Sequence, residues 1–370
     1  MIVGVPKEIK EQENRVAITP AGVRTLVGGG NTVLIQKNAG VGSGITDTMY
    51  KEAGAKIVPR LEDVYKKSDM VMKVKEPLPQ EYKLFREGLL LFTYLHLAAD
   101  ENLTRELMKS GVTAVAYETI QLDNGLLPLL MPMSEVAGRM SVQLGAQFLE
   151  ARHGGRGILL SGMAGVPPAD VTIIGGGVVG YSAAKVAVGL GAQVVILDNN
   201  IQRLRELDEI MHGRVITMMS TPESIERMAS FSDLVVGSVL VAGARAPKLL
   251  SKDMVKKMKP GSVIVDVAID QGGCVETSKL TTHTEPIFIR YGVVHYCVGN
   301  MPGAVPRTST LALTNSTLPY AQMLADKGLE KAIADDVPLA KGVNVHQGRV
   351  THPGVARAFR MKADPVCAWD

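Results

Sequence analysis

A glycine-rich hexapeptide at residues 175–180, GGGVVG, has the G-x-G-x-x-G spacing that is typical of turns binding a dinucleotide. The apolar run Val171–Ile174 precedes it and a helical stretch follows it, which is the context that the motif requires. The first glycine permits the tight turn, the second lets the backbone approach a pyrophosphate, and the third allows close helix–strand packing. Free N–H groups at the start of the helix then face the phosphates. The residues expected to contact the dinucleotide here are Gly175, Gly177, Val178, Val179 and Gly180.

The next expected strand, Gln193–Leu197, leads directly to a carboxylate, Asp198. A carboxylate at this position accepts hydrogen bonds from the ribose hydroxyls and repels a 2′-phosphate. Arg203 follows on the next helix, where it either softens the preference against NADP or is simply a solvated helix residue. Strand, helix, second strand and terminal carboxylate are in register, so the sequence predicts a unit that binds NAD.

Four ionisable residues stand at or after the ends of other apolar runs, or in the loop after the first strand. They are Arg15, Lys75, His96 and Asp270. In a doubly wound sheet, chemistry collects at the carboxyl ends of strands, which makes each of them a candidate. Taken singly, each also has an ordinary interpretation, because a lone Lys or Arg is usually a surface residue and a lone His at an apolar edge is usually structural.

The elements that must position these residues alternate between short strands and helices, which predicts mostly parallel, doubly wound sheets. The strands expected in the first third are Ile2–Val5, Thr32–Gln36, Met70–Lys75, Leu89–Tyr94 and Thr113–Tyr117. The helices expected between them are Pro20–Gly28, Asp47–Ala53 and Asp100–Ser110. A long helix is expected from Ser134, as its N-cap, to about Arg152.

A second series of strands follows the long helix. Its members are Val171–Ile174, Gln193–Leu197, Arg214–Thr217, Leu234–Gly237, Ser262–Val267 and Val293–Val298. A helical stretch then returns from Arg307 to about Lys327. A chain of 370 residues is too long for one ordinary core. We therefore expect an α/β protein of two doubly wound, Rossmann-like domains with a cleft between them. Residues 1–130 and 305–370 form a discontinuous substrate (catalytic) domain, and residues 131–304 the NAD-binding domain.

Composition excludes several classes of protein. The formal net charge is only +3 and no block of like charges occurs, which argues against nucleic acid as a partner. The longest apolar run, Leu89–Ala99, is too short to cross a bilayer and contains a histidine. The N-terminus has no features of an export signal. The scattered cysteines Cys274, Cys297 and Cys367 fit neither a disulfide framework nor a zinc site, so a reducing cytoplasm is expected.

Several longer segments of the sequence resemble the alanine dehydrogenase family. They are Val5-Pro6-Lys7-Glu8, Glu13-Asn14-Arg15-Val16, Val74-Lys75-Glu76-Pro77, Tyr94-Leu95-His96, Pro132-Met133-Ser134-Glu135, the GGGVVG turn, the segment 265–273 (VDVAIDQGG) and the segment 298–303 (VGNMPG). Together they span nearly the whole chain. The nucleotide-binding portion of proton-translocating transhydrogenase shares the overall plan, and saccharopine dehydrogenase is a more distant relative.

The resemblance implies reversible oxidative deamination of L-alanine by NAD⁺ and water to pyruvate, ammonium and NADH. Arg15 and Lys75 would then bind the substrate, since guanidinium and ammonium groups match its carboxylate and carbonyl. His96 has an ordinary pKa near neutrality, which suits proton transfer, and Asp270 would orient the attacking water or share that transfer. Both are therefore the expected catalytic residues.

The same resemblance implies a set of further residues along the dinucleotide. They are Ser134, Val178, Asp198, Arg203, Ser220, Val239, Leu240, Lys279, Val267, Ala268, Ile269, Asp270, Val298, Gly299, Asn300 and Met301. Some relatives hold a metal ion on the helix after Pro319, but Met323 and Lys327 stand at the corresponding positions and are poor ligands, so no metal is predicted there. Relatives are usually homohexamers, and an oligomer is expected.

Two other functions compete with this one. A transhydrogenase subunit would bind NAD(H) and pass hydride to a partner attached to a membrane, but such portions usually lack the full set of alanine-handling residues. A non-catalytic NAD-sensing module would tolerate the loss of Lys75 or His96. Both residues are present here, so the sequence favours the dehydrogenase.

Overall fold

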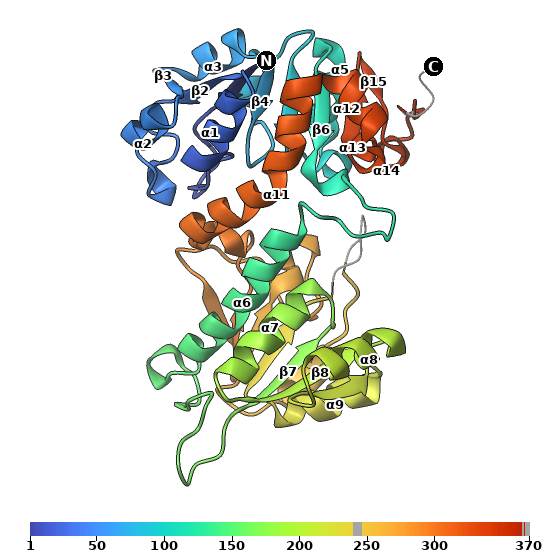
Figure 1. Cartoon of the computed structure of the whole chain (residues 1–370). Helices are drawn as coiled ribbons and strands as arrows, with labels where there is room; N and C mark the ends of the chain where they lie inside the picture. Colours follow the sequence, from blue (N-terminus) through green and yellow to red (C-terminus); the bar gives the residue numbers. More distant parts are fainter. Residues whose placement is uncertain (240–245, 365, 367–370) are drawn as a thin grey trace. The chain divides into compact units, whose positions relative to one another are not determined.

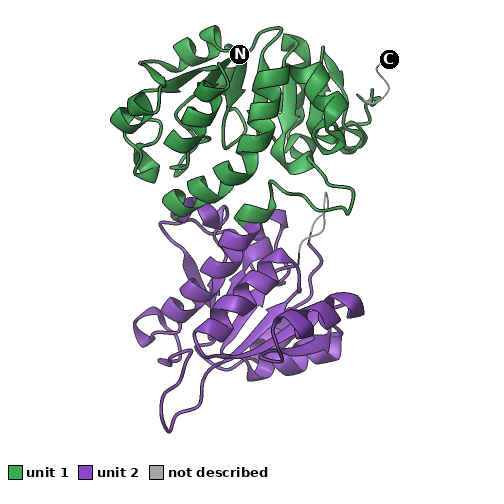
Figure 2. Ribbon diagram, viewed as in Figure 1, with its two compact units in different colours: residues 1–133, 305–370 green, residues 134–304 purple. Residues whose placement is uncertain are grey.

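The chain divides into two compact units, drawn in green and purple in Figure 2. Unit 1 consists of Met1–Met133 with Val305–Asp370, and unit 2 consists of Ser134–Ala304. The coordinates are a computed structural model that describes residues 1–239, 246–364 and 366 (Figure 1). Within the described residues, no helix is long and apolar enough to cross a membrane.

Unit 1 is built on an eight-stranded sheet. Its strands are β1 (Ile2–Val5), β2 (Thr32–Gln36), β3 (Lys56–Val58), β4 (Met70–Met72), β5 (Leu90–Thr93), β6 (Thr113–Ala116), β14 (Val343–His346) and β15 (Arg349–Val350). They lie in the order β15-β14-β6-β5-β4-β1-β2-β3; β1 to β6 are parallel, β14 is antiparallel to β6, and β15 is antiparallel to β14. The parallel part has the strand order of a Rossmann sheet, in which the connections reverse direction between β1 and β4.

Helices cover both faces of this sheet (Figure 1). They are α1 (Pro20–Gly28), α2 (Asp47–Glu52), α3 (Leu61–Lys67), α4 (Pro79–Tyr82), α5 (Glu101–Ser110), α11 (Pro306–Lys327), α12 (Leu329–Asp335), α13 (Val337–Gly342) and α14 (Pro353–Ala358). Met70 and Met72 pack into a core cluster that includes α1 and α11, while Val71 between them packs into a second cluster with α3 and α5. Because both faces are buried, the strand is apolar throughout rather than alternating.

Unit 2 repeats the same plan. Its strands are β7 (Asp170–Ile174), β8 (Gln193–Asp198), β9 (Ile216–Met219), β10 (Leu234–Gly237), β11 (Val263–Asp266), β12 (Ile287–Arg290) and β13 (Val293–Tyr296). Their order is β12-β13-β11-β10-β7-β8-β9, and only β12, at the edge, is antiparallel. The connections reverse between β7 and β10. The helices are α6 (Met131–Phe148, which begins in unit 1), α7 (Val178–Gly189), α8 (Ile201–Ile210), α9 (Pro222–Phe231) and α10 (Lys252–Lys256).

The expected fold class of two doubly wound α/β sheets is confirmed. Several expected boundaries are wrong. The long helix starts at Met131, so Ser134 lies within its first turns and is not its N-cap. It ends at Phe148, because the chain continues into a short 3₁₀ turn, Ala151–His153. The strand expected over 70–75 ends at Met72, because the Val74 amide donates to a carboxylate instead of a neighbouring strand.

Smaller corrections concern strand ends and short elements. The strand expected over 214–217 is displaced to Ile216–Met219, because Arg214 closes a turn at the end of α8 through a hydrogen bond to Met211. Strands β6 and β13 end one and two residues earlier than expected, as the chain bends at the sheet edge. The short edge strands β3 and β12, helix α3 and the C-terminal elements α12, α13, β14, β15 and α14 were not predicted.

Candidate functional site

The glycine turn joins β7 to α7 at the point where the strand order of unit 2 reverses. Gly175 has φ +103°, a conformation that side chains rarely adopt. A Cβ at Gly180 would lie 1.8 Å from the carbonyl oxygen of Gly175, so only glycine fits there. A Cβ at Gly177 would meet none of the described atoms within 4 Å, so space beside this backbone is open. The turn therefore fits a pyrophosphate at the N-terminus of α7.

The carboxylate of Asp198 lies at the end of β8 and contacts this turn directly. Its Oδ2 accepts a hydrogen bond from the Gly176 amide at 2.6 Å, and its Oδ1 accepts one from the Asn200 amide at 2.8 Å. A carboxylate oxygen has two lone pairs, so each of these oxygens retains acceptor capacity for a ribose hydroxyl. Arg203 donates from Nε to the Gly176 carbonyl at 2.7 Å, which makes it a partner of the turn rather than a freely solvated residue.

The other expected dinucleotide residues of unit 2 follow the ends of its strands. Ser220 comes after β9 and donates its amide to the carbonyl of Asp198 at 2.9 Å, while Val239 comes after β10. The Nζ of Lys279 lies 4.7 Å from the ring centre of Phe288, which belongs to the edge strand β12. Leu240 falls outside the described residues, and the ligand contacts of all these residues stay predictions.

Asp270 and the run Val298–Met301 are brought together at the ends of β11 and β13. The Asn300 amide donates to Asp270 Oδ2 at 3.1 Å, and a Cβ on Gly299 would come within 2.7 Å of Asp270 Oδ1. Val267–Asp270 form most of a 3₁₀ turn, Val267–Gln271, that directly follows β11. The two expected nicotinamide-side runs therefore share one edge of the sheet, with an exposed carboxylate between them.

A buried carboxylate, Asp266, holds the loop that follows this turn, and sequence reasoning missed it. It accepts hydrogen bonds from the Cys274 amide at 3.2 Å, the Val275 amide at 3.1 Å and the Ser278 hydroxyl at 2.7 Å. Three donors compensate for taking the charge out of water. Its position at the end of a strand was the available signal.

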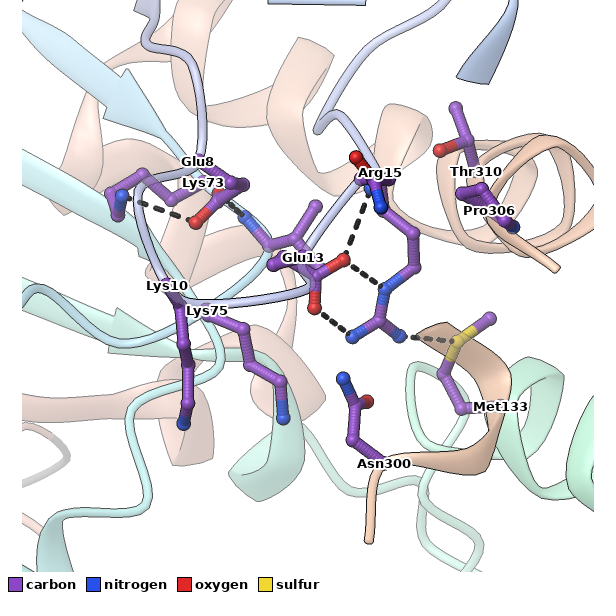
Figure 3. A network of polar contacts seen from close by, with 12 residues as sticks. Glu8, Lys10, Glu13, Arg15, Lys73, Lys75, Met133, Asn300, Pro306 and Thr310 are labelled. Carbon is purple, nitrogen blue, oxygen red and sulfur yellow. Dashed lines mark hydrogen bonds and ion pairs between the residues drawn. The ribbon is translucent and has the colours of Figure 1, made fainter. Parts of the chain in front are cut away.

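Arg15 lies at the point where the strand order of unit 1 reverses, in the loop between β1 and α1 (Figure 3). The side chain is only 2% exposed, and it binds Glu13 in a bidentate manner, Nε to Oε1 at 2.7 Å and Nη2 to Oε2 at 2.5 Å. Burial alone would raise the pKa of Glu13, but the hydrogen bonds and charge of Arg15 outweigh it and hold that pKa below its ordinary value. Arg15 Nη1 also contacts the sulfur of Met133 at 3.1 Å.

Lys75 follows β4, on the other side of the same reversal (Figure 3). Burial, together with the positive charge of nearby Arg15, lowers the pKa of this ammonium below its ordinary value. The carbonyl of Lys75 accepts a hydrogen bond from the Thr93 hydroxyl at 3.0 Å, which ties it to the end of β5. Lys10 lies nearby in Figure 3 and forms an ion pair with Glu76. Two cationic side chains, Arg15 and Lys75, are thus held together where a small anion would bind.

A fully buried ion cluster supports the segment that carries Lys75. Lys73 Nζ lies 3.2 Å from Glu8 and 3.0 Å from Glu81, and all three side chains are almost completely buried. Glu8 also accepts the Val74 amide at 2.6 Å, and Glu81 accepts the Leu78 amide at 2.8 Å. Burial raises the pKa of Glu8, although the charge of Lys73 opposes that shift. The cluster fixes the backbone on both sides of Lys75.

His96 stands after β5 with φ +52°, a left-handed conformation that is uncommon for a residue with a side chain. Glu118 holds it there, because its carboxylate accepts the His96 amide at 2.5 Å and the Leu95 amide at 3.1 and 3.2 Å. The imidazole lies nearly parallel to the Tyr94 ring, with the ring centres 6.0 Å apart, and the residue is exposed. An exposed imidazole is thus fixed on a constrained backbone.

Sequence reasoning named candidate ligand-binding side chains, whose ligand contacts stay predictions, and missed the side chains that hold them in place. Glu13 belongs to the segment Glu13-Asn14-Arg15-Val16, and its closeness in sequence to Arg15 could have indicated that the two side chains pair. Glu8 likewise belongs to one of the family-like segments, Val5-Pro6-Lys7-Glu8, but no role was predicted for it. Glu118 gave no local signal, because it meets His96 only through the pairing of β5 with β6.

Comparison with known proteins gives matches over nearly the whole chain. The family models for the alanine dehydrogenase/PNT N-terminal and C-terminal domains match residues 4–137 and 141–353. Alanine dehydrogenase 2 of Staphylococcus aureus (strain USA300) is 58% identical over 367 residues, covering 99% of this chain and 98% of its own. The alanine dehydrogenase of Staphylococcus haemolyticus (strain JCSC1435) has the same identity and coverage.

Solved structures give the same picture. An L-alanine dehydrogenase is 56% identical with a TM-score of 0.95, covering 97% of this chain and 99% of its own. A transhydrogenase from Sinorhizobium meliloti is 24% identical with a TM-score of 0.82, covering 95% of this chain and 99% of its own. The second likeness is one of fold alone.

Proposed function

The chain belongs to the alanine dehydrogenase/PNT family, and we propose that it is an NAD-dependent alanine dehydrogenase. The reaction is the reversible oxidative deamination of L-alanine by NAD⁺ and water to pyruvate, ammonium and NADH. The membership confirms the resemblance seen in the sequence motifs. The observation that carries the proposal is the pair of cations, the buried Arg15 and the half-buried Lys75, at the strand-order reversal of unit 1.

The residues of this chain have distinct tasks in that reaction. The guanidinium of Arg15 is held by Glu13 in a fixed orientation, and its positive charge attracts the substrate carboxylate. Lys75 supplies a second positive charge to the substrate carboxylate and carbonyl. His96, exposed and held by Glu118, transfers protons to and from the substrate nitrogen and oxygen. Asp270 orients the attacking water. NAD⁺ supplies the hydride acceptor when it is bound.

The dinucleotide lies along the unit 2 residues that the family resemblance indicates. The glycine turn takes the pyrophosphate and Asp198 the adenosine ribose, which favours NAD over NADP. The residues expected to line the rest of the cofactor are Ser134, Arg203, Ser220, Val239, Leu240, Lys279, Val267, Ala268, Ile269, Asp270, Val298, Gly299, Asn300 and Met301. Their support is their position after the strands of a sheet whose carboxyl ends share one edge.

We propose further that the enzyme is cytoplasmic and forms a homo-oligomer, expected to be a hexamer. Light scattering after size-exclusion chromatography would measure the mass of that oligomer. Residues 1–130 with 305–370 handle the substrate, and residues 131–304 hold NAD. No metal is proposed at Met323 and Lys327, where Lys327 is paired with Asp335 at 2.6 Å. No nucleic acid or membrane partner is proposed.

The test is a spectrophotometric assay of the purified full chain. L-Alanine with NAD⁺ should produce NADH absorbance at alkaline pH, and pyruvate with ammonium should consume it. The variants His96→Ala and Asp270→Asn should lose most of this activity, by about 100-fold or more for a lost proton-transfer group. His212→Asn is a matched control, since His212 is exposed and also has a positive φ, +53°, that asparagine tolerates.

The alternatives predict a different result. A protein that binds NADH but turns over neither alanine nor pyruvate with ammonium is not an alanine dehydrogenase. Hydride exchange between NADH and an NADP analogue without amino-acid turnover would favour a transhydrogenase subunit. NADH binding with no hydride chemistry of either kind would favour an NAD-sensing module.

A further inference from the structure

Gly176, in the middle of the glycine turn, is held by charged side chains at both its backbone amide and its backbone carbonyl. Its amide donates to Asp198 at 2.6 Å, and its carbonyl accepts from Arg203 Nε at 2.7 Å. A side chain at Gly176 would strike Leu207 of α8 at 2.6 Å, so the turn lies directly against that helix. The turn is thus packed against α8, beside Asp198 and Arg203.

Arg203 is engaged on three sides. Besides the Gly176 carbonyl, its Nη1 pairs with Glu206 Oε2 at 2.8 Å, one helical turn further along α8. Its guanidinium lies 6.0 Å from the ring centre of Tyr181, which also has Lys185 at 5.5 Å. The Arg203 side chain is only 28% exposed, whereas that of Glu206 is 60% exposed. Glu206 is therefore the contact that solvent reaches most easily.

The balance of these charges decides how a 2′-phosphate would be received. NADP carries this phosphate at the ribose position that Asp198 borders, and Asp198 repels it. An arginine beside the same position ordinarily binds the phosphate through a bidentate pair. Here Glu206 neutralises the Arg203 charge and occupies one arm of its guanidinium. A phosphate would have to compete with that carboxylate for the guanidinium of Arg203.

We propose that Glu206 is a specificity-determining residue that lets this site choose NAD over NADP by keeping Arg203 paired. This inference rests on the proposed binding of NAD by unit 2. It resolves the two interpretations of Arg203 in the sequence, because the half-buried arginine is paired with Glu206 and with the glycine turn, and a phosphate would have to displace Glu206. Asp198 repels the 2′-phosphate, and Glu206 pairs with Arg203, the cation that would otherwise bind this phosphate.

The test measures binding of NADH and NADPH to the full chain by nicotinamide fluorescence, without amino acid. In Glu206→Gln, the affinity for NADPH should rise about 3- to 10-fold, because removing one exposed negative charge is worth on the order of 1 kcal/mol. NADH affinity should change less than twofold. The gain should shrink at 0.5 M salt, since the charges are partly exposed and screened.

Two matched variants make the result specific. Glu209→Gln removes the same charge from the same helix at an exposed residue with no ion pair among the described side chains, and it should leave the NADH to NADPH ratio unchanged. Glu206→Gln combined with Arg203→Gln should lose the gain, because the freed arginine is its source.

The outcomes separate this inference from the proposed function. An unchanged ratio in Glu206→Gln, an equal gain in Glu209→Gln, or a gain that survives Arg203→Gln would each overturn the role of Glu206 while leaving NAD binding intact. Failure of the unmodified protein to bind NADH would overturn the proposed function, and this inference with it.

Discussion

Replacing Lys73 by methionine should destabilise unit 1 strongly. The side chain is 0% exposed and is the ion-pair partner of both Glu8, at 3.2 Å, and Glu81, at 3.0 Å. Methionine keeps most of the apolar stem but leaves two buried carboxylates without a counter-ion. Breaking a buried pair in this way costs about 3–5 kcal/mol. For a unit of this size, each 1 kcal/mol lowers Tm by about 2–4 °C, so a loss of about 6–20 °C is expected.

Differential scanning calorimetry of the full chain is the suitable assay, because the two units can unfold in separate transitions. Saturating NADH identifies the unit 2 transition, since a ligand that binds only the folded state raises its midpoint. The unit 1 transition should move in Lys73→Met. Lys66→Met is the control, because Lys66 is exposed on α3 and makes no ion pair among the described residues.

The dependence on pH tests the cause. Burial already raises the pKa of Glu8, and without Lys73 that pKa should rise further. A carboxyl whose pKa is raised on folding contributes stability below its unfolded value, and that stability is lost as pH rises through the folded value. The deficit of Lys73→Met should therefore be larger at pH 8 than at pH 5, and Glu8→Gln added to it should restore part of the loss. A deficit no larger than that of Lys66→Met, or one independent of pH, would refute this reasoning.

Two further predictions concern the two ligand positions. Gly180→Ala should weaken NADH binding by 10-fold or more or destabilise unit 2 by about 2 kcal/mol, since its Cβ would lie 1.8 Å from the Gly175 carbonyl oxygen. Gly189→Ala, on the same helix with open space around it, should instead stabilise by about 0.5–1 kcal/mol in thermal unfolding. Because burial and Arg15 lower the pKa of Lys75, pyruvate affinity of the NADH complex should fall with rising pH well before an ordinary lysine titrates. A flat fluorescence titration between pH 7 and 10 would contradict this.

Elements set by local rules were predictable to the residue. Strand β1, helix α1 and strand β2 have the expected bounds, and α1 has proline in its first turn and the Thr19 hydroxyl as its N-cap. The glycine turn was equally predictable, because each of its conformational requirements is met by a single glycine at a fixed position. Fold class and family followed from such local signals.

Features that depend on distant partners were not predictable. Strand β4 was expected to continue to Lys75, but Glu8, far back in the chain, takes the Val74 amide and ends the pairing. His96 was chosen because an imidazole suits proton transfer, whereas its left-handed backbone depends on Glu118, in the 3₁₀ turn Tyr117–Thr119 after β6. In each case a single carboxylate compensates for backbone N–H groups that leave the regular sheet, and sequence spacing does not show which carboxylate it is.

The six parallel strands of each sheet have the same order, yet the two sheets provide for their expected ligands at the reversal by opposite means. In unit 2, α7 starts almost directly after β7, so free helix N–H groups reach the edge of the sheet and glycines leave room for a pyrophosphate. In unit 1, a long loop separates β1 from α1, and the Thr19 hydroxyl already accepts a hydrogen bond from the first turn of that helix. The Gly22 amide of that first turn is therefore already satisfied, and Arg15 and Lys75 supply positive charge near the reversal. A small carboxylate offers few atoms to bind, so two oriented cations suit it better than a cradle of amides.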